Sequence, residues 1–459
     1  MSRVIEQNRS PLVEQPLKTS AATGATLACM GLADSIPLMH GSQGCGAFAK
    51  VYLIQHFREP IPLQNTAIDH IAAVMGGDDN LAQALLLLCE QHQPRLLMIM
   101  TTGLTEMQGC DVTRVIREFR ATYPQYQHIY IVPVSTPDFV GSMQSGFAAA
   151  LESCVEQLLA AASNKSELPA TQSKQLNVFC SVALTSADLE LLERYCHAFG
   201  FEPIFLPNIA HSLDGHLAAD DFSVTSTGGT TIEQLTRMQS SVASLVFGTS
   251  MNAAAGLLEK QCQIPSYPLG MAMGLAATDQ LVLILSQLSK QAVPGWIARQ
   301  RQRLQDAMLD THFLLSASPM ALALEPDAAE GYANLLSEVG AELKLVVTTM
   351  NSPALKQLKA ERIVVGDLSD LEPDLAVLEM VVGNTHCANL CEPQVPVLRA
   401  GYPCHDQFGN SDVLQLGYEG ARARLFAMAN LFKSHHQDEV PVHVSAYRFG
   451  PEQTQTKSQ

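Results

Sequence analysis

The segment most suited to metal chemistry is HGSQGCG, residues 40–46, in which Cys45 lies between Gly44 and Gly46. Glycines let a backbone adopt conformations that other residues avoid, and they let a ligand or a second chain approach closely. A thiol on such a glycine-rich loop is well placed to bind a metal as thiolate. A buried cysteine in a tight turn accounts for the same residues, so both interpretations stay open at this point.

Histidines and charged side chains flank this loop. His40 precedes it, and the HFREP segment that follows contains His56, Arg58 and Glu59. These side chains could form a charged network that fixes the Cys45 loop or meets a partner subunit. A solvated or intrachain ion pair is the other interpretation.

A second group of soft metal ligands lies near the C-terminal end. His386, Cys387, Cys391 and Cys404 fall within a short stretch of chain that reads as loops. Their spacing differs from the standard zinc patterns. A metal site and simple loop packing are the two interpretations.

The remaining cysteines favour packing roles. The chain has 11 cysteines and no CxxC pair. Cys110 lies in a loop after a strand and is a weaker metal candidate, and Cys262 lies in a turn. Five others fall within apolar helix or strand patterns and are predicted core residues: Cys29, Cys89, Cys154, Cys180 and Cys196. Because an iron–sulfur cluster takes about four protein ligands, a cluster bound by Cys45 would need thiolates from another polypeptide.

Several function classes are excluded. There is no GxxxxGK[ST] phosphate loop, and Gly76–Gly77 and Gly228–Gly229 lack the GxGxxG dinucleotide spacing. No GxSxG nucleophile elbow occurs. The net charge of −17 argues against nucleic acid or an anionic membrane as the main partner. No apolar run reaches the ~20 residues of a membrane helix, and the N-terminal segment lacks a signal-peptide core, so we expect a cytoplasmic protein.

The elements that must position these residues alternate along the chain. With 459 residues, of which 47% are hydrophobic, two to four domains are expected. Strand–helix alternation predicts α/β architecture: three doubly wound, Rossmann-like parallel-sheet domains over 1–170, 171–292 and 293–436, followed by a polar tail over 437–459. The segment 163–175 is interpreted as a linker. Helices are predicted over 81–92, 111–123, 141–162, 186–200, 295–313, 327–340 and 418–435, and strands over 96–101, 128–134, 177–182, 202–207, 243–248, 343–349, 362–367, 374–383 and 396–401.

The motifs resemble a known family. HGSQGC (40–45), HFREP (56–60), VSTPDFVGS (134–142), GGTT (228–231) and GYEGA (417–421) are similar, in the same order, to the β-type subunits of the nitrogenase component 1 family. The resemblance runs from about Pro16 to Phe432. It implies a fold like that of the nitrogenase MoFe protein, and it is greatest for the subunits on which the iron–molybdenum cofactor is assembled.

The resemblance also implies a ligand set. Catalytic β subunits supply three thiolates to an eight-iron cluster, at positions that match Ser20, Cys45 and Gly103 here. Two of the three are missing, so the resemblance implies one [4Fe–4S] cluster shared with the partner NifE, with Cys45 as the ligand from this chain. Ser20 is expected to cap a helix rather than bind metal.

The implied assembly is a non-catalytic α2β2 scaffold with NifE. It would take an iron–sulfur precursor from NifB, hold it mainly on NifE while molybdenum and homocitrate are inserted with the iron protein NifH, and pass the cofactor to the MoFe protein. Two alternatives stay open. The chain could be the β-type subunit of a reductase, either nitrogenase or dark-operating protochlorophyllide reductase, or a structural paralogue without a cluster.

Overall fold

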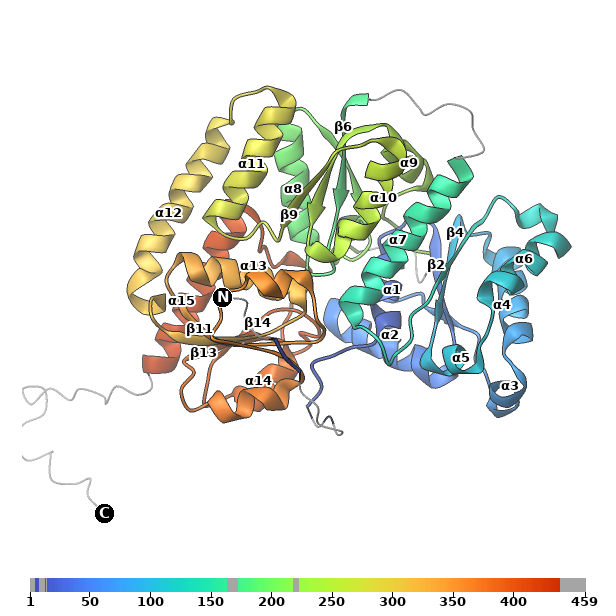
Figure 1. Cartoon of the computed structure of the whole chain (residues 1–459), viewed down its shortest axis with the longest axis horizontal. Helices are drawn as coiled ribbons and strands as arrows, with labels where there is room; N and C mark the ends of the chain where they lie inside the picture. Colours follow the sequence, from blue (N-terminus) through green and yellow to red (C-terminus); the bar gives the residue numbers. More distant parts are fainter. Residues whose placement is uncertain (1–4, 8–12, 14, 163–171, 218–222, 438–459) are drawn as a thin grey trace, which may run out of the picture.

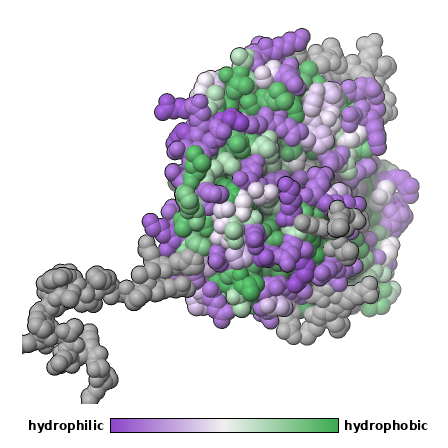
Figure 2. Space-filling view, turned by 60° about the vertical axis from the view of Figure 1, so that its left-hand side comes forward, coloured by the Kyte–Doolittle hydropathy of each residue, from purple (hydrophilic) through white to green (hydrophobic). Residues whose placement is uncertain are grey.

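Three parallel β-sheets with helices on their faces make up the molecule (Figure 1). The computed structural model describes the chain except for residues 1–4, 8–12, 14, 163–171, 218–222 and 438–459. Among the described helices, none is long and apolar enough to cross a membrane. Figure 2 shows hydrophobic areas among hydrophilic ones on the face that carries α12 (Gly295–Leu315).

The first sheet has the order β3-β2-β4-β5. Side chains on its two faces pack into two separate apolar cores. Side chains of a strand point alternately to opposite faces. Leu96, Met98 and Met100 therefore join the large core, whereas Leu97 and Ile99 join a separate one. The elements are α1 (Ala21–Met30), β2 (Ser35–His40), α2 (Gln43–Phe57), β3 (Gln64–Asn65), α3 (His70–Met75), α4 (Asp78–His92), β4 (Leu96–Thr101), α5 (Gly103–Gln108), α6 (Val112–Thr122), β5 (Tyr130–Val134) and α7 (Met143–Ala162).

The second sheet has the order β7-β6-β8-β9, again with all strands parallel. Its elements are β6 (Gln172–Phe179), α8 (Ser186–Ala198), β7 (Glu202–Leu206), α9 (Ile232–Arg237), β8 (Ser241–Phe247), α10 (Asn252–Cys262), β9 (Ser266–Gly270) and α11 (Leu275–Ser289).

The third sheet has six strands in the order β1-β12-β11-β10-β13-β14. The first described strand, β1, pairs with β12, so this sheet combines a strand from near the start of the chain with strands from its last third. The elements are β1 (Ile5–Gln7), β10 (Pro319–Ala323), α13 (Pro326–Glu338), β11 (Glu342–Thr348), β12 (Arg362–Val365), β13 (Met380–Gly383), α14 (Thr385–Cys391), β14 (Val397–Arg399) and α15 (Gly417–Gln437). Helix α12 packs along α15 (Figure 1).

The predicted α/β class with three parallel sheets is confirmed, and several local predictions need correction. Five strands were not predicted: β1, β2, β3, β9 and β10. The strand predicted over 374–383 begins only at Met380, because residues 368–374 form a 3-10 helix. Strand β6 begins at Gln172, inside the segment interpreted as a linker. Residues 163–171 and the tail after Gln437 lie outside the described residues, and the domain boundaries stay a prediction.

A buried carboxylate connects the sheets. Asp327, near the start of α13, is fully buried and accepts hydrogen bonds from Ser181 Oγ (2.8 Å) and Thr249 Oγ1 (3.0 Å) of the second sheet's loops. Its backbone N–H donates to Gln144 Oε1 of α7 at 2.9 Å. Burial raises the pKa of this carboxyl, and the hydrogen bonds from hydroxyl groups act in the opposite direction.

Helices α1 and α7 touch backbone to backbone. A Cβ placed on Gly146 would lie 1.8 Å from the Ala21 carbonyl oxygen, and one on Gly24 would lie 1.9 Å from the Met143 carbonyl oxygen. Both glycines are therefore required by close approach, and the contact fixes α1 against the first sheet.

We predict that Gly146→Ala lowers the free energy of unfolding by about 3 kcal/mol, because the methyl group would have to displace backbone atoms. Gly256→Ala is the matched control, since a Cβ at Gly256 meets nothing within 4 Å. That control should gain about 0.5–1 kcal/mol from reduced backbone entropy. Thermal unfolding of both variants checks this, and equal melting temperatures would contradict the close-contact explanation.

Candidate functional site

The carboxyl ends of three neighbouring strands bring the main motifs together. In the ladder, His40 at the end of β2 pairs with Thr101 at the end of β4, and Met100 pairs with Val134 of β5. The segments that follow these ends carry Cys45, Gly103 and Asp138 respectively. In doubly wound sheets ligands bind at this edge.

The sequence predicted that Cys45 lies on a loop. The structure instead places Cys45 in the first turn of α2. The N-cap residue Ser42 makes no side-chain bond to the helix backbone, and its Oγ lies 3.3 Å from Cys45 Sγ. Unpaired N–H groups and the helix dipole at such a terminus attract anionic ligands. The thiol is half-buried, and it is one of the residues that line a pocket.

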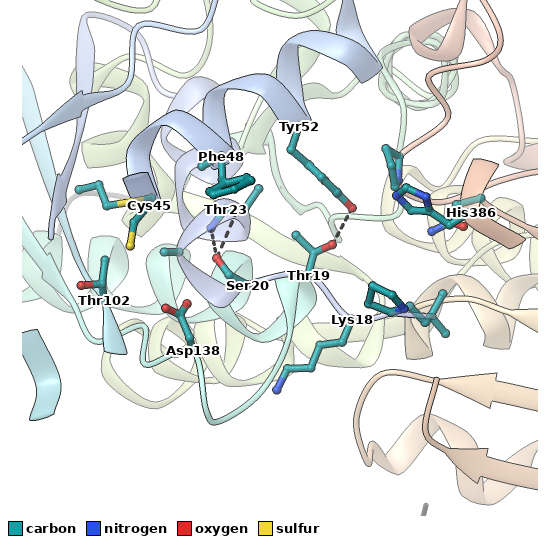
Figure 3. A pocket seen from close by; sticks show the side chains of 17 residues that line it. Lys18, Thr19, Ser20, Thr23, Cys45, Phe48, Tyr52, Thr102, Asp138 and His386 are labelled. Atoms are coloured by element: carbon teal, nitrogen blue, oxygen red, sulfur yellow. Dashed lines mark hydrogen bonds between the residues drawn. The ribbon is translucent and has the colours of Figure 1, made fainter. Parts of the chain in front are cut away.

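This pocket has a volume of about 360 Å³ and gathers residues from α1, α2, the end of β4 and the loop after β5 (Figure 3). The third sheet contributes Asn384, His386 and Pro403 to it. The complete lining is Pro16, Leu17, Lys18, Thr19, Ser20, Ala22, Thr23, Met39, Cys45, Phe48, Ala49, Tyr52, Thr102, Asp138, Asn384, His386 and Pro403.

Ser20 has the capping role that the sequence predicted. It is the N-cap of α1, and its Oγ accepts a hydrogen bond from Thr23 N at 3.2 Å. Its hydroxyl also lies 3.2 Å from Thr23 Oγ1. Because Ser20 lines the same pocket as Cys45, two of the three thiolate positions implied by the resemblance face one space (Figure 3).

The glycines beside Cys45 differ in their steric role. A Cβ on Gly46 would lie 2.6 Å from Asn65 Nδ2, which donates to the Ser42 carbonyl at 3.0 Å. Gly46 is therefore needed for the contact that holds the start of α2. A Cβ on Gly44 would meet only Ser42 Oγ, at 4.0 Å, so the sterics do not explain Gly44.

His40 supports the site from inside the sheet. It is fully buried, with Nδ1 3.0 Å from Thr66 Oγ1 and Nε2 3.2 Å from Cys110 Sγ. Burial lowers the pKa of His40 to about 4, so the ring is neutral at pH 7. Cys110 donates to Asp78 Oδ1 at 3.0 Å, and burial raises the pKa of its thiol to about 12. Cys110 is not among the pocket's lining residues.

The HFREP segment ties α2 to the third sheet. His56 Nδ1 accepts a hydrogen bond from Cys404 N at 3.0 Å, and Arg58 Nη2 donates to the His405 carbonyl at 2.7 Å. The Arg58 guanidinium also lies over the Phe408 ring, 4.9 Å from its centroid. Within the described residues no ion pair joins Arg58 and Glu59. Partial burial and the nearby Asp214 raise the pKa of Glu59, against the opposite effect of His216.

The second cysteine group is arranged differently from the prediction. His386, Cys387 and Cys391 lie on helix α14 rather than in loops, whereas Cys404 is in a loop. Cys387 and Cys391 are buried with their sulfurs 3.9 Å apart, and Cys404 Sγ donates to the Gly401 carbonyl at 3.4 Å. Among the described residues, no three His, Cys, Asp or Glu side chains are placed to hold a metal ion. Within the described residues these four side chains are not gathered into one metal site, and a metal role for them stays a prediction.

The predicted core cysteines are confirmed as buried. Burial raises the pKa of Cys29 and Cys196 to about 12 and that of Cys89 to about 11, and raises those of Cys154 and Cys180 further. Such thiols stay protonated and are poor metal ligands. Cysteines with partial exposure are Cys45, Cys110 and Cys262.

Comparison with known proteins places the chain in a family. The family model "Nitrogenase component 1 type Oxidoreductase" matches residues 20–433. The chain belongs to the nitrogenase component 1 family. It is similar to the nitrogenase iron-molybdenum cofactor biosynthesis protein NifN of Klebsiella pneumoniae, with 41% identity over 95% of this chain and 94% of that protein. NifN of Nostoc sp. is also 41% identical, over 94% of this chain and 96% of its own length.

A solved structure of the same family supports the fold. "Nitrogenase Cp1 at pH 6.5" superposes with a TM-score of 0.87 at 26% identity, covering 96% of this chain and 98% of that one. The predicted resemblance to this family and its MoFe-protein-like fold is thereby confirmed. The related family members named above are proteins of iron–molybdenum cofactor biosynthesis.

Sequence reasoning overlooked several lining residues, above all Lys18, Tyr52 and Asp138. Asp138 had a usable signal, because it follows a predicted strand of a doubly wound sheet. Tyr52 lies seven residues after Cys45 on α2, and its hydroxyl accepts from Thr19 Oγ1 at 2.7 Å. That bond joins α2 to the segment before α1, which only the folded chain reveals.

We predict that acid weakens the fold through His56. Burial lowers the pKa of His56 to about 3, so between about pH 6.5 and 3 the unfolded state binds a proton that the folded state does not. The free energy of unfolding should therefore fall by about 1.4 kcal/mol for each pH unit below about 6.5 because of His56. Urea unfolding at about pH 7 and about pH 5.5 checks this. His56→Gln should lose less stability on acidification than the wild type, whereas the exposed-residue control His128→Gln should match the wild type.

Proposed function

We propose that this chain is the β-type subunit of a cofactor-assembly scaffold with a NifE-like partner, and that Cys45 is its single ligand to a shared [4Fe–4S] cluster. The observation that carries the proposal is the pocket in which Cys45 is the one thiol among the lining residues. Ser20, at a second position of the implied ligand set, uses its hydroxyl to cap α1. Gly103, at the third, has no side chain.

The residues present fit one ligand to a shared cluster. The Cys45 thiol stands at a helix N-terminus and opens into about 360 Å³ of space, which leaves room for a group held mainly by another chain. With about four thiolates needed per cluster, the partner would supply three. The bound cluster would provide one-electron transfer, and this chain's residues would hold and orient it.

Exposed apolar side chains beside the pocket support a partner interface. Helix α3 presents Ile71, Val74 and Met75 to solvent, and the neighbouring α5 presents Met107. Contiguous apolar surface on a folded protein marks an interaction site. Further exposed apolar residues of the first sheet's helices and loops are Phe48, Phe139 and Val140. Since α5 begins at the pocket and carries Met107, a partner bound on α3 and α5 would lie close to Cys45.

In this proposal the surface of α3 and α5 receives the iron protein NifH, and the surface around the Cys45 pocket receives NifE. The cargo is the iron–sulfur precursor delivered by NifB, which the complex holds, mainly through NifE, while molybdenum and homocitrate are added. The completed cofactor then leaves for the MoFe protein. The names of the related proteins, which specify cofactor biosynthesis, support this assignment.

The alternative is a β-type subunit of a reductase, either nitrogenase or dark-operating protochlorophyllide reductase. Two observations weigh against it: the missing thiolates at Ser20 and Gly103, and the similarity to proteins named for cofactor biosynthesis. Reduction of acetylene or protochlorophyllide by the purified complex at enzyme-like rates would favour the reductase.

We predict that Cys45→Ala removes the shared cluster but leaves the complex with the NifE-like partner assembled. Anaerobic co-purification, iron quantitation and reduced-state EPR measure this, with a loss of about four iron atoms per αβ pair expected. Cys262→Ala is the matched control, because Cys262 is also partly exposed but ends α10 in the second sheet. Unchanged iron and spectrum in Cys45→Ala would reduce Cys45 to a packing residue.

We further predict that Met75→Asp weakens binding of the iron protein at least tenfold, since it puts a charge into an apolar contact. Met75 is 81% exposed, so the fold of the isolated chain should be unaffected. Leu87→Asp, on an exposed position of α4, is the control. Pull-down or interferometry with the nucleotide-loaded iron protein measures both, and equal affinities would place the docking surface elsewhere.

A further inference from the structure

We propose that Asp138 sets the reduction potential of the cluster that Cys45 binds, by holding a negative charge at the wall of the cluster pocket. This inference rests on the proposed function. It assigns a role to a residue that belongs to no ligand set, and it concerns how the cluster works rather than whether it is bound.

The geometry places the carboxylate in the pocket. Asp138 follows β5 and lines the pocket with Cys45 and Thr102. Figure 3 shows the Asp138 carboxylate and the Cys45 thiol facing the same space. Asp138 Oδ2 accepts a hydrogen bond from Gly103 N, the first residue of α5, at 3.4 Å. This bond holds the carboxylate next to the position from which the family's catalytic subunits extend a thiolate.

Gly103 lies directly beside the Asp138 carboxylate. A Cβ there would lie 3.6 Å from Asp138 Oδ2 and 3.8 Å from Asp138 Cβ, at ordinary contact distances. The Asp138 carboxylate thus lies beside Gly103, the position at which the resemblance implies a cysteine thiolate in catalytic β subunits.

Few other charges face the pocket. Of the remaining lining residues, Lys18 carries a full positive charge, and the pKa of His386 is lowered by burial and by His405, so its imidazole is neutral at pH 7. Glu106, the carboxylate on α5, accepts hydrogen bonds from Ser135 Oγ (2.6 Å) and Thr101 Oγ1 (2.5 Å), and it is not a lining residue. Among the described residues that line the pocket, Asp138 is thus the one carboxylate.

The sign of the effect follows from Coulomb's law. One-electron reduction adds negative charge to a cluster that its thiolates already make anionic, and a nearby carboxylate raises the free energy of the reduced form. Charge and solvent exposure are established determinants of cluster potentials. A partner that covers the pocket would strengthen the interaction by excluding water. Asp138 therefore lowers the potential and makes the reduced cluster a stronger electron donor, and Lys18 acts in the opposite direction.

Asp138→Asn in the purified complex tests this directly. Asparagine keeps the shape and an oxygen that can accept from Gly103 N, and it removes the charge. An anaerobic redox titration followed by EPR should show a higher midpoint potential. A tenfold change in the reduction equilibrium corresponds to about 59 mV for one electron. Lys18→Gln should shift the potential downward. Asp111→Asn, at the exposed N-cap of α6 and outside the pocket, should leave it unchanged.

The outcomes separate this inference from the proposed function. Iron content and EPR intensity in the wild type and in Cys45→Ala decide whether the shared cluster exists, and its absence would overturn both proposals. A cluster present in Asp138→Asn with an unshifted potential would overturn the Asp138 role alone. Loss of the cluster in Asp138→Asn would also overturn it, because Asp138 would then act in holding the cluster. Opposite shifts in Asp138→Asn and Lys18→Gln at equal iron content support it.

Discussion

The parallel pairing of β2, β4 and β5 is the constraint on which the candidate site depends. Parallel strands of a doubly wound sheet all end at one edge, so segments far apart in sequence meet there. The register His40↔Thr101 and Met100↔Val134 delivers α2, α5 and the Asp138 loop to a single pocket. A slip of one residue would invert the faces of a strand, and the two separate apolar layers of Leu97 and Met98 oppose such a slip.

Helix α2 connects the first sheet to the third. Its first turn is held against β3 by the Asn65–Ser42 hydrogen bond, and its last turn is held to the third sheet through His56 and Arg58. The helix is therefore fixed at both ends by these hydrogen bonds and along one buried face by Ala49, Leu53 and Phe57, which pack into the large core. The exposed side of α2 stays free, and there Phe48 is 81% exposed beside the pocket. His56, which holds the last turn of α2, also makes the contact between α2 and the third sheet less stable in acid.

The sequence predicted the architecture well where apolar periodicity was strong, as in β4 and α6. It missed β10, whose residues PMALA form a short apolar run after a helix, and β9, whose SYPLG contains a proline and a glycine. Short strands of this kind are recognisable only through their neighbours in the sheet. Cys45 was assigned to a loop because Gly44 and Gly46 disfavour helix locally. The Asn65 contact, 19 residues beyond Gly46, overrides that preference. The Ser20 cap was predictable because it depends on local geometry, whereas the Asp138–Gly103 bond depends on strand order.

The composition of the pocket supports the proposal that this chain acts together with a partner. Within the described residues it offers one half-buried thiol, one carboxylate and one ammonium group around about 360 Å³ of space, with apolar side chains exposed on the adjoining helices. The resemblance implies thiolates at the positions of Ser20 and Gly103 in catalytic β subunits, and this chain has a thiol at neither. Ser20 stabilises the start of α1, and Gly103 donates its N–H to Asp138. Replacing Ser20 would remove the cap of α1, whereas a Cβ at Gly103 would meet Asp138 only at ordinary contact distances of 3.6 Å or more. Under the proposed function, the single thiol among the lining residues means that the partner chain supplies the remaining cluster ligands.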